Sequence, residues 1–145
     1  MILVTGAAGK TGRAVIQALS REEHAVRALV HRPQQARPLV DLGARDVVVG
    51  DMRTRAVMDE AARGVRAVYH ICPNMSPEET SIGQLALGAA RAAGVKHFVY
   101  HSVLHPQTEE MPHHWHKMQV EALILKSGLP YTILQPAAYM QNVLA

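Results

Sequence analysis

The sequence predicts an α/β fold in which helices cover both faces of a doubly wound parallel sheet. Two observations lead to this prediction. Short runs rich in β-branched residues alternate with longer helical patterns along the chain, and this alternation is typical of consecutive βαβ units. A glycine-rich segment, TGAAGKTG, also separates the first predicted strand from the first predicted helix. The length of 145 residues, with 48% hydrophobic residues, suits a single domain with a packed core.

The predicted elements follow one another without a linker or an internal repeat. Strands are expected at 1–5, 25–31, 45–49, 65–71, 96–103 and 131–134. Helices are expected at 11–21, 35–42, 54–63, 76–93 and 113–127. The fourth helix opens on Ser76-Pro77-Glu78-Glu79, which has the form of a capping box with proline at the first helical position. Right-handed crossovers between six parallel strands favour the order 3-2-1-4-5-6 of a Rossmann fold.

The glycine-rich segment has the spacing G-x-x-G-x-x-G and is predicted to hold a pyrophosphate. Gly6 permits a tight turn, Gly9 lets backbone N–H groups approach the phosphates, and Gly12 lets the helix pack closely. The helix N-terminus adds a partial positive charge at the same place. Glycines also serve ordinary turns, but here they stand between strand and helix at the start of the fold. A Walker A motif is excluded, because Thr11 and Gly12 stand where it needs glycine and lysine.

The residues after the second strand decide the expected choice of cofactor. A site for NAD would carry Asp or Glu about 20 residues beyond the loop, whereas this chain carries Val30-His31-Arg32. The Arg32 guanidinium can stack on an adenine and pair with a 2′-phosphate, and Lys10 can assist it. The alternative is that Arg32 is only a surface residue before a proline. NADP(H) is therefore expected in preference to NAD(H).

Composition excludes several other classes of function. The net charge is +3, but the basic residues are scattered and no readout motif accompanies them, so no direct nucleic-acid partner is expected. The single Cys72 excludes an internal disulfide. His113 and His116 share a helix face, but no carboxylate or cysteine completes a metal site. Without a long apolar run or a basic signal sequence, the protein is expected to be cytoplasmic and to have no membrane contact.

Several segments together resemble the NmrA-like branch of the atypical short-chain dehydrogenases/reductases. They are TGAAGKTG, VHRP after the second strand, Gly50-Asp51, AARAAGVKHFVYHS, and EALILKSGLPYTILQPAAYMQN. The last is similar to the family pattern E-x-x-L-x-x-S-G-L-x-Y-T-I-L-R-P-x-x-Y-x-x-N. The resemblance covers the whole chain and looks nearest to quinone-reductase and triphenylmethane-dye-reductase members. It implies an NADP(H)-binding Rossmann domain followed by a small C-terminal substrate domain, and this second domain would be absent here.

The resemblance also implies a set of site residues. The phosphate loop would contribute Gly6, Ala8, Gly9, Lys10, Thr11 and Gly12. Asp51 and Met52 would flank the adenine. The cofactor would be lined nearer its nicotinamide by Ile71, Cys72, Pro73, Ser102 and Val103. The substrate cleft would be walled by Pro136, Ala137 and Tyr139. Residues 1–145 would thus form one NAD(P)-binding domain, with 136–145 the start of the cleft segment in a truncated chain.

Two departures from family patterns bear on catalysis. Ordinary short-chain dehydrogenases carry Tyr-x-x-x-Lys, whereas this chain has His113 and Lys117 at that spacing. Lys117 keeps the ribose-holding role and Ser102 is retained, while His113 is either a general acid or an exposed histidine at a helix start. A quinone needs little protein acid, because its reduced dianion takes protons from water. The second departure is Gln135, which stands where relatives carry arginine.

The resulting hypothesis is an NADPH-dependent reductase that transfers hydride to a quinone-like or other conjugated acceptor. The main alternative is a non-catalytic NADP(H)-binding redox sensor of the NmrA type, which would signal to a regulatory protein partner. A lyase or epimerase with a fixed NAD is a third alternative and is less favoured, because such enzymes usually need the missing tyrosine. The open edge of the sixth strand favours a homodimer.

Overall fold

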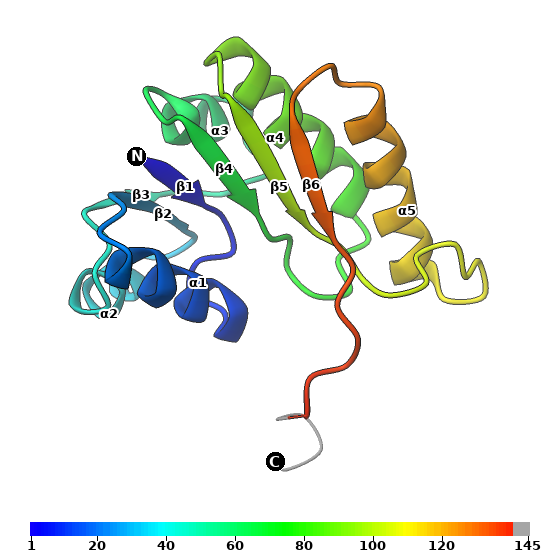
Figure 1. Ribbon diagram of the computed structural model, residues 1–145, viewed down its shortest axis with the longest axis horizontal. Helices are drawn as coiled ribbons and strands as arrows, with labels where there is room; N and C mark the ends of the chain where they lie inside the picture. The colour runs from blue at the N-terminus through cyan, green and yellow to red at the C-terminus, as the bar shows by residue number, and fades with distance from the viewer. Residues whose placement is uncertain (141–145) are drawn as a thin grey trace.

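The computed structural model describes residues 1–140 and places all six strands in one parallel sheet. The order β3-β2-β1-β4-β5-β6 confirms the predicted Rossmann topology (Figure 1). The strands are β1 (Ile2–Val4), β2 (Val26–Val30), β3 (Asp46–Val49), β4 (Ala67–His70), β5 (His97–His101) and β6 (Tyr131–Leu134). Val4 of β1 lies beside Ala28 of β2 and Tyr69 of β4. The chain thus changes its direction of winding between β1 and β4, where open α/β sheets place their ligand crevice.

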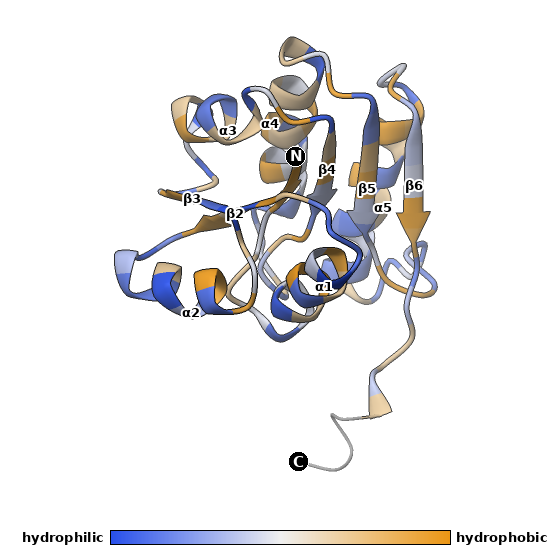
Figure 2. Cartoon of the chain, turned by 60° about the vertical axis from the view of Figure 1, so that its left-hand side comes forward, coloured by the Kyte–Doolittle hydropathy of each residue, from blue (hydrophilic) through white to orange (hydrophobic). Residues whose placement is uncertain are grey.

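The helices form two layers, one on each face of the sheet (Figure 2). The first layer holds α1 (Lys10–Arg21) and α2 (Ala36–Asp41), which follows the 3₁₀ turn η1 (Pro33–Gln35). The second holds α3 (Arg55–Ala62), α4 (Glu79–Ala92) and α5 (Pro112–Leu125). Each layer buries its own apolar cluster against the strands, with Ile16 and Leu39 on one face and Phe98 and Ile124 on the other. Within residues 1–140, no helix has the length and apolar character needed to cross a membrane.

Four strands end earlier than the sequence predicts, and two of these differences shape the site. The fourth strand ends at His70 rather than residue 71, and the fifth at His101 rather than residue 103. Ile71, Ser102 and Val103 therefore leave the sheet at its carboxyl edge. The Ser102 N–H still donates to the Leu134 carbonyl at 2.8 Å, so Ser102 stays attached to β6 although it lies beyond the end of β5.

The prediction of a capping box at Ser76 is wrong. Helix α4 begins at Glu79, and its N-cap, Glu78, makes no side-chain capping bond. The Ser76 hydroxyl accepts the Glu78 N–H at 3.2 Å within a turn before the helix. The Glu79 carboxylate does not reach back to the serine, because buried partners on β5 and α5 hold it in the interior.

Candidate functional site

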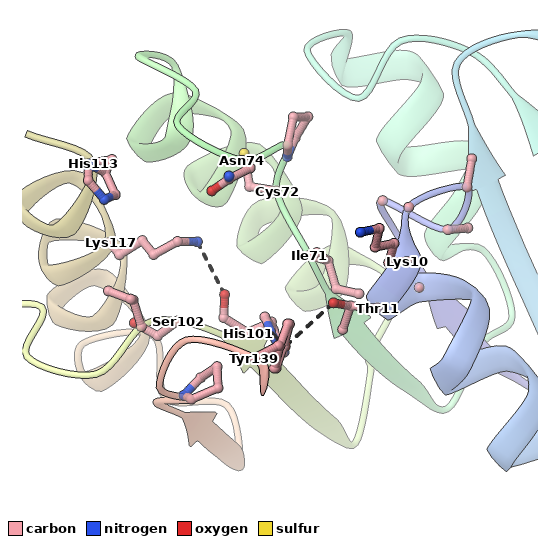
Figure 3. Close-up of a pocket in the computed structure, with 18 of the residues that line it drawn as sticks. Lys10, Thr11, Ile71, Cys72, Asn74, His101, Ser102, His113, Lys117 and Tyr139 are labelled. Atoms are coloured by element: carbon pink, nitrogen blue, oxygen red, sulfur yellow. Dashed lines mark hydrogen bonds between the residues drawn. The ribbon is translucent and has the colours of Figure 1, made fainter. Parts of the chain in front are cut away.

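A cavity of about 800 Å³ opens at the carboxyl edge of the sheet, where the arrowheads of β4, β5 and β6 point in Figure 1. Its walls come from segments that are far apart in the sequence, as Figure 3 shows. They are residues 6–12, 29–31, 71–74, 101–104 and 136–139, with Gln35, Met52, His113, His114 and Lys117. This volume lies within the range of small-molecule and cofactor sites.

One wall is the glycine loop between β1 and α1, which has no room for a side chain at Gly6 or Gly12. Gly6 has a φ of +58°, and a Cβ there would lie 2.7 Å from the Ile71 carbonyl oxygen. A Cβ on Gly12 would lie 2.5 Å from the Gly6 oxygen. Gly12 thus lets the first turn of α1 pack on the loop backbone, and Gly6 lets the loop pass close to the end of β4.

The first turn of α1 is open to an anion. Gly9 precedes the helix in an extended conformation without a side-chain cap, and the first turn carries no acidic residue. Its N–H groups and partial positive charge therefore face the cavity unopposed, as pyrophosphate-binding helices require. Ala8, Lys10 and Thr11 line the cavity here. The loop and helix thus fit a dinucleotide.

The floor of the cavity follows β4. The Thr5 hydroxyl donates to the Ile71 carbonyl at 3.0 Å and accepts the Ile71 N–H at 2.9 Å, which fixes the end of β4 against β1. Ile71, Cys72 and Pro73 then line the cavity together with Asn74, which the sequence did not single out. Burial, with the nearby Glu79 carboxylate, raises the pKa of the Cys72 thiol, so this thiol stays protonated and unreactive.

The opposite wall is built on a buried ion pair. Lys117 Nζ donates to Glu79 Oε1 at 2.9 Å and to the His101 carbonyl at 3.2 Å. The same Glu79 oxygen accepts the Tyr100 hydroxyl at 2.7 Å. Glu79 is 2% exposed and Lys117 is 8% exposed. The sequence reasoning did not identify Glu79 as the counterion of Lys117, because its position in the sequence suggested a helix-capping residue instead.

Ser102 is held from behind by a second buried carboxylate. Its hydroxyl donates to Glu121 Oε1 of α5, and Glu121 is 7% exposed. The Gln135 amide donates to both Glu121 oxygens at 3.0 Å. Gln135 thus supplies hydrogen bonds, but no charge, where relatives are expected to carry arginine.

A third group of polar residues crosses the cavity. The Tyr69 hydroxyl lies 3.1 Å from His101 Nδ1, and the Tyr139 hydroxyl lies 2.7 Å from His101 Nε2. Thr11 of the phosphate loop donates to the Tyr139 oxygen at 3.4 Å. His101 and Tyr69 were also missed by the sequence reasoning. The available signal was their position at or near the carboxyl ends of adjacent strands.

Of the remaining predicted residues, five line the cavity and two do not. Val103, Pro136 and Ala137 line the cavity, as do Met52 and His113. Burial, followed by the charges of His114 and Lys117, lowers the pKa of His113, so its imidazole is neutral at pH 7.

Arg32 and Asp51 are not among the lining residues. Arg32 is exposed, between the lining residues His31 and Gln35. The Arg53 guanidinium donates to the Asp51 carboxylate at 2.6 Å, and this pairing lowers the pKa of Asp51 to about 2. Residues 1–140 contain no group of three or more His, Cys, Asp or Glu side chains placed to hold a metal ion.

Comparison with known proteins assigns the family. The model of the NmrA-like family matches residues 1–145. The chain belongs to the NmrA-like family. An NADPH-dependent quinone oxidoreductase from Escherichia coli, solved with NADPH, is 31% identical, with a TM-score of 0.89 over 99% of this chain and 51% of its own. Citrobacter sp. triphenylmethane reductase is 30% identical, with a TM-score of 0.87 over 98% of this chain and 50% of its own.

A curated relative carries a third reductase name. The (4-alkanoyl-5-oxo-2,5-dihydrofuran-3-yl)methyl phosphate reductase of Streptomyces griseus is 36% identical over an alignment of 148 positions. The alignment covers 100% of this chain and 50% of the relative. This NmrA-like chain thus spans about half the length of the relatives it matches. These similarities confirm the resemblance to quinone and triphenylmethane reductases that the sequence segments indicate.

Proposed function

We propose that this NmrA-like chain binds NADP(H) in the cavity and reduces a small conjugated acceptor such as a quinone. The observation that carries the proposal is that two walls face each other across the cavity. The glycine loop with the open end of α1 forms one wall, and the buried Lys117–Glu79 pair forms the other. A reduced nicotinamide, when bound, supplies a hydride to the acceptor.

The chain's own residues bind and orient in this proposal. The N–H groups at the start of α1 receive the pyrophosphate, and Ile71 with Cys72 keeps water from the floor. Lys117 holds the ribose, and its ammonium is already fixed by Glu79 and the His101 carbonyl. A rigid ammonium of this kind favours positioning, which accounts for a large share of rate enhancement in many enzymes.

Preference for NADP(H) over NAD(H) is part of the proposal and depends on Arg32. This side chain is exposed beside the cavity, and the Arg32 N–H donates to Gln35 Oε1 at 2.9 Å, which fixes the backbone there. Arg32→Asp should weaken NADPH binding about 10–100-fold, as expected for a lost charge-assisted contact, and weaken NADH binding far less. Arg21→Asp makes the same charge change at the C-terminal end of α1, away from the cavity, and should affect the binding of neither NADPH nor NADH. Equal losses for both cofactors in Arg32→Asp would remove the 2′-phosphate assignment.

Calorimetric titration with NADPH and NADH, followed by NADPH oxidation with a series of quinones, tests the proposal. Tight NADPH binding with turnover supports a reductase. Tight binding without turnover would instead indicate a redox sensor that passes its state to a regulatory protein. Absence of binding would contradict the role of the phosphate loop.

A cytoplasmic homodimer completes the proposed description. β6 pairs only with β5 within the described sheet, and Tyr131 and Leu134 on it are exposed. An open strand edge with apolar side chains is a template for pairing with a second chain. Light scattering that gives a monomer at micromolar concentration would contradict this assembly.

A further inference from the structure

The cavity holds a hydroxyl group that is placed to give up a proton. Tyr139, on the segment after β6, turns its ring toward His101 and Thr11, and its hydroxyl lies 2.7 Å from His101 Nε2 and 3.4 Å from the Thr11 hydroxyl. Tyr139 is 39% exposed, so it can also reach solvent. His101 and Thr11 belong to opposite walls of the cavity, and Tyr139 joins them.

The partners of His101 determine which way these hydrogen bonds run. Tyr69 is half-buried, and burial, with the neighbouring Tyr139, raises the pKa of its hydroxyl. It therefore stays protonated, and within residues 1–140 its hydroxyl has no hydrogen-bond partner other than His101 Nδ1, at 3.1 Å. We therefore assign Tyr69 as the donor to that nitrogen, because the half-buried O–H would otherwise have no acceptor. Burial and the charge of Lys117 lower the pKa of His101, so the imidazole is neutral and carries its one proton on Nε2. That Nε2–H then donates to the Tyr139 oxygen.

This arrangement leaves the Tyr139 proton free. The Tyr139 oxygen accepts from both His101 and Thr11, so its own O–H bond is available to a ligand in the cavity. Two donors to one oxygen also stabilise the negative charge that appears when the proton leaves. The arrangement is that of a tyrosine prepared to act as a general acid.

The other candidates are committed elsewhere. The Ser102 proton is donated to Glu121. Lys117 donates to Glu79 and to the His101 carbonyl. His113 belongs to the first turn of α5 and stacks edge-on against His114 at a centroid distance of 4.6 Å. None of the three has a free proton held against both walls of the cavity.

We propose that Tyr139 is the proton donor of this site, oriented by His101 and Thr11, and that it extends the acceptors to neutral conjugated carbonyl compounds whose reduced anions are strong bases. The proposal depends on the reductase function proposed above. Such an acceptor takes a hydride at carbon from the reduced nicotinamide and becomes an enolate. The Tyr139 O–H bond breaks as the proton moves to the enolate, and the phenolate regains a proton from water. In total, the acceptor gains two electrons and two protons, and the nicotinamide is oxidised by two electrons.

A series of acceptors graded by their need for a proton provides the test. A cationic triarylmethane dye needs none, because hydride alone gives a neutral product. A quinone needs little help, because water protonates its reduced form. A conjugated enone needs the most. Tyr139→Phe should leave dye reduction within about threefold of wild type, lower quinone turnover by about tenfold or less, and lower enone reduction by about 10²–10⁴-fold, the usual contribution of a general acid.

Two controls separate this proposal from the proposed function. Tyr131→Phe makes the same change at an exposed tyrosine of β6 that is not among the cavity-lining residues, and it should leave the reduction of all three acceptors unchanged. Both variants should bind NADPH within about threefold of wild type. A loss in Tyr139→Phe that is equal for dye, quinone and enone would overturn the role of Tyr139, whereas a wild type that binds NADPH and reduces none of them would overturn the reductase function instead.

A measurement that needs no turnover tests the arrangement itself. Nitrogen chemical shifts of the His101 ring, measured with NADPH bound, should show the proton on Nε2, and Tyr139→Phe should shift the Nε2 signal much more than the Nδ1 signal. Tyr69→Phe should do the reverse. A proton on Nδ1 in the wild type would overturn the proposal whatever the activity.

Discussion

The two walls of the cavity are built by different means. The loop wall consists of backbone from one continuous segment, residues 6–12, and its shape depends on positions where no side chain fits. The opposite wall consists of side chains that come from the ends of β4 and β5, from α4 and α5, and from the segment after β6. These side chains form three networks, centred on Glu79, Glu121 and His101.

This difference explains how each wall responds to change. A backbone wall binds through N–H groups, and hydrogen bonds from these groups do not depend on side-chain identity. A wall of buried polar side chains is interdependent, since loss of one member leaves another without its partner. The loop wall is therefore suited to a ligand group that many proteins bind in the same way, such as a phosphate. The network wall is suited to the groups by which the ligands of related proteins differ.

Breaking the Glu79–Lys117 pair should give the largest loss of stability. Glu79→Leu leaves the Lys117 ammonium buried without a counterion, and removal of one partner from a buried pair typically costs about 3–5 kcal/mol. Urea denaturation measures this change. Lys117→Met in the same chain removes the stranded charge and should recover more than half of the loss, while NADPH binding stays weak. A double variant no more stable than Glu79→Leu would show that the pair is not the cause.

A side chain in the loop wall should cost less stability but more cofactor affinity. Gly12→Val places a Cβ where it would lie 2.5 Å from the Gly6 oxygen, and overpacking of this kind costs about 1–3 kcal/mol. The displaced loop should weaken NADPH binding at least about 100-fold, because the pyrophosphate contacts depend on its backbone. Gly88→Ala is the matched control: its Cβ would lie no nearer than 3.7 Å from another residue. That variant should bind NADPH normally.

The sequence predicted the fold and the position of the glycine loop, but not the pairings within the network wall, for a physical reason. Strand order, the phosphate loop and the location of the site follow from local periodicity, glycine spacing and the handedness of crossovers. The counterion of Lys117 lies 38 residues away, and nothing local distinguishes Glu79 from a helix-capping glutamate. Tyr139 and His101 likewise meet only because strand ends converge. Such pairs require the folded backbone, because no local pattern in the sequence specifies which residue contacts which.

One buried side chain outside the three networks gives the protein a pH dependence. His70 is fully buried beneath Tyr100, its Nδ1 lies 2.9 Å from the Thr5 hydroxyl, and its Nε2 has no partner in residues 1–140. Burial, with the charge of Lys117, lowers the pKa of His70 to about 3.

Between about pH 6.5 and pH 3 the unfolded chain therefore binds a proton at this residue that the folded chain does not. Stability from this source is complete above pH 6.5 and falls by about 1.4 kcal/mol per pH unit as the pH decreases. Denaturation at several pH values gives the free energy of unfolding as a function of pH. Below pH 6.5 the slope of this dependence should be smaller in His70→Gln than in wild type by about 1.4 kcal/mol per pH unit. In His24→Asn, where an exposed histidine is replaced, the slope should equal that of wild type. Equal slopes for His70→Gln and wild type would contradict a neutral buried imidazole.

The smallest effect is expected at Gln135, where the family resemblance leads us to expect arginine. Glu121 is a buried carboxylate whose partners, Ser102 and Gln135, are both neutral. Gln135→Arg offers a two-pronged, charge-assisted contact to the same two oxygens, and we expect a gain of about 1 kcal/mol because the carboxylate is already desolvated. In Glu121→Gln the same substitution leaves the new guanidinium without a counterion and should destabilise the protein. The sign of the effect thus depends on one carboxylate, and a gain in both backgrounds would show that Gln135→Arg acts through packing rather than charge.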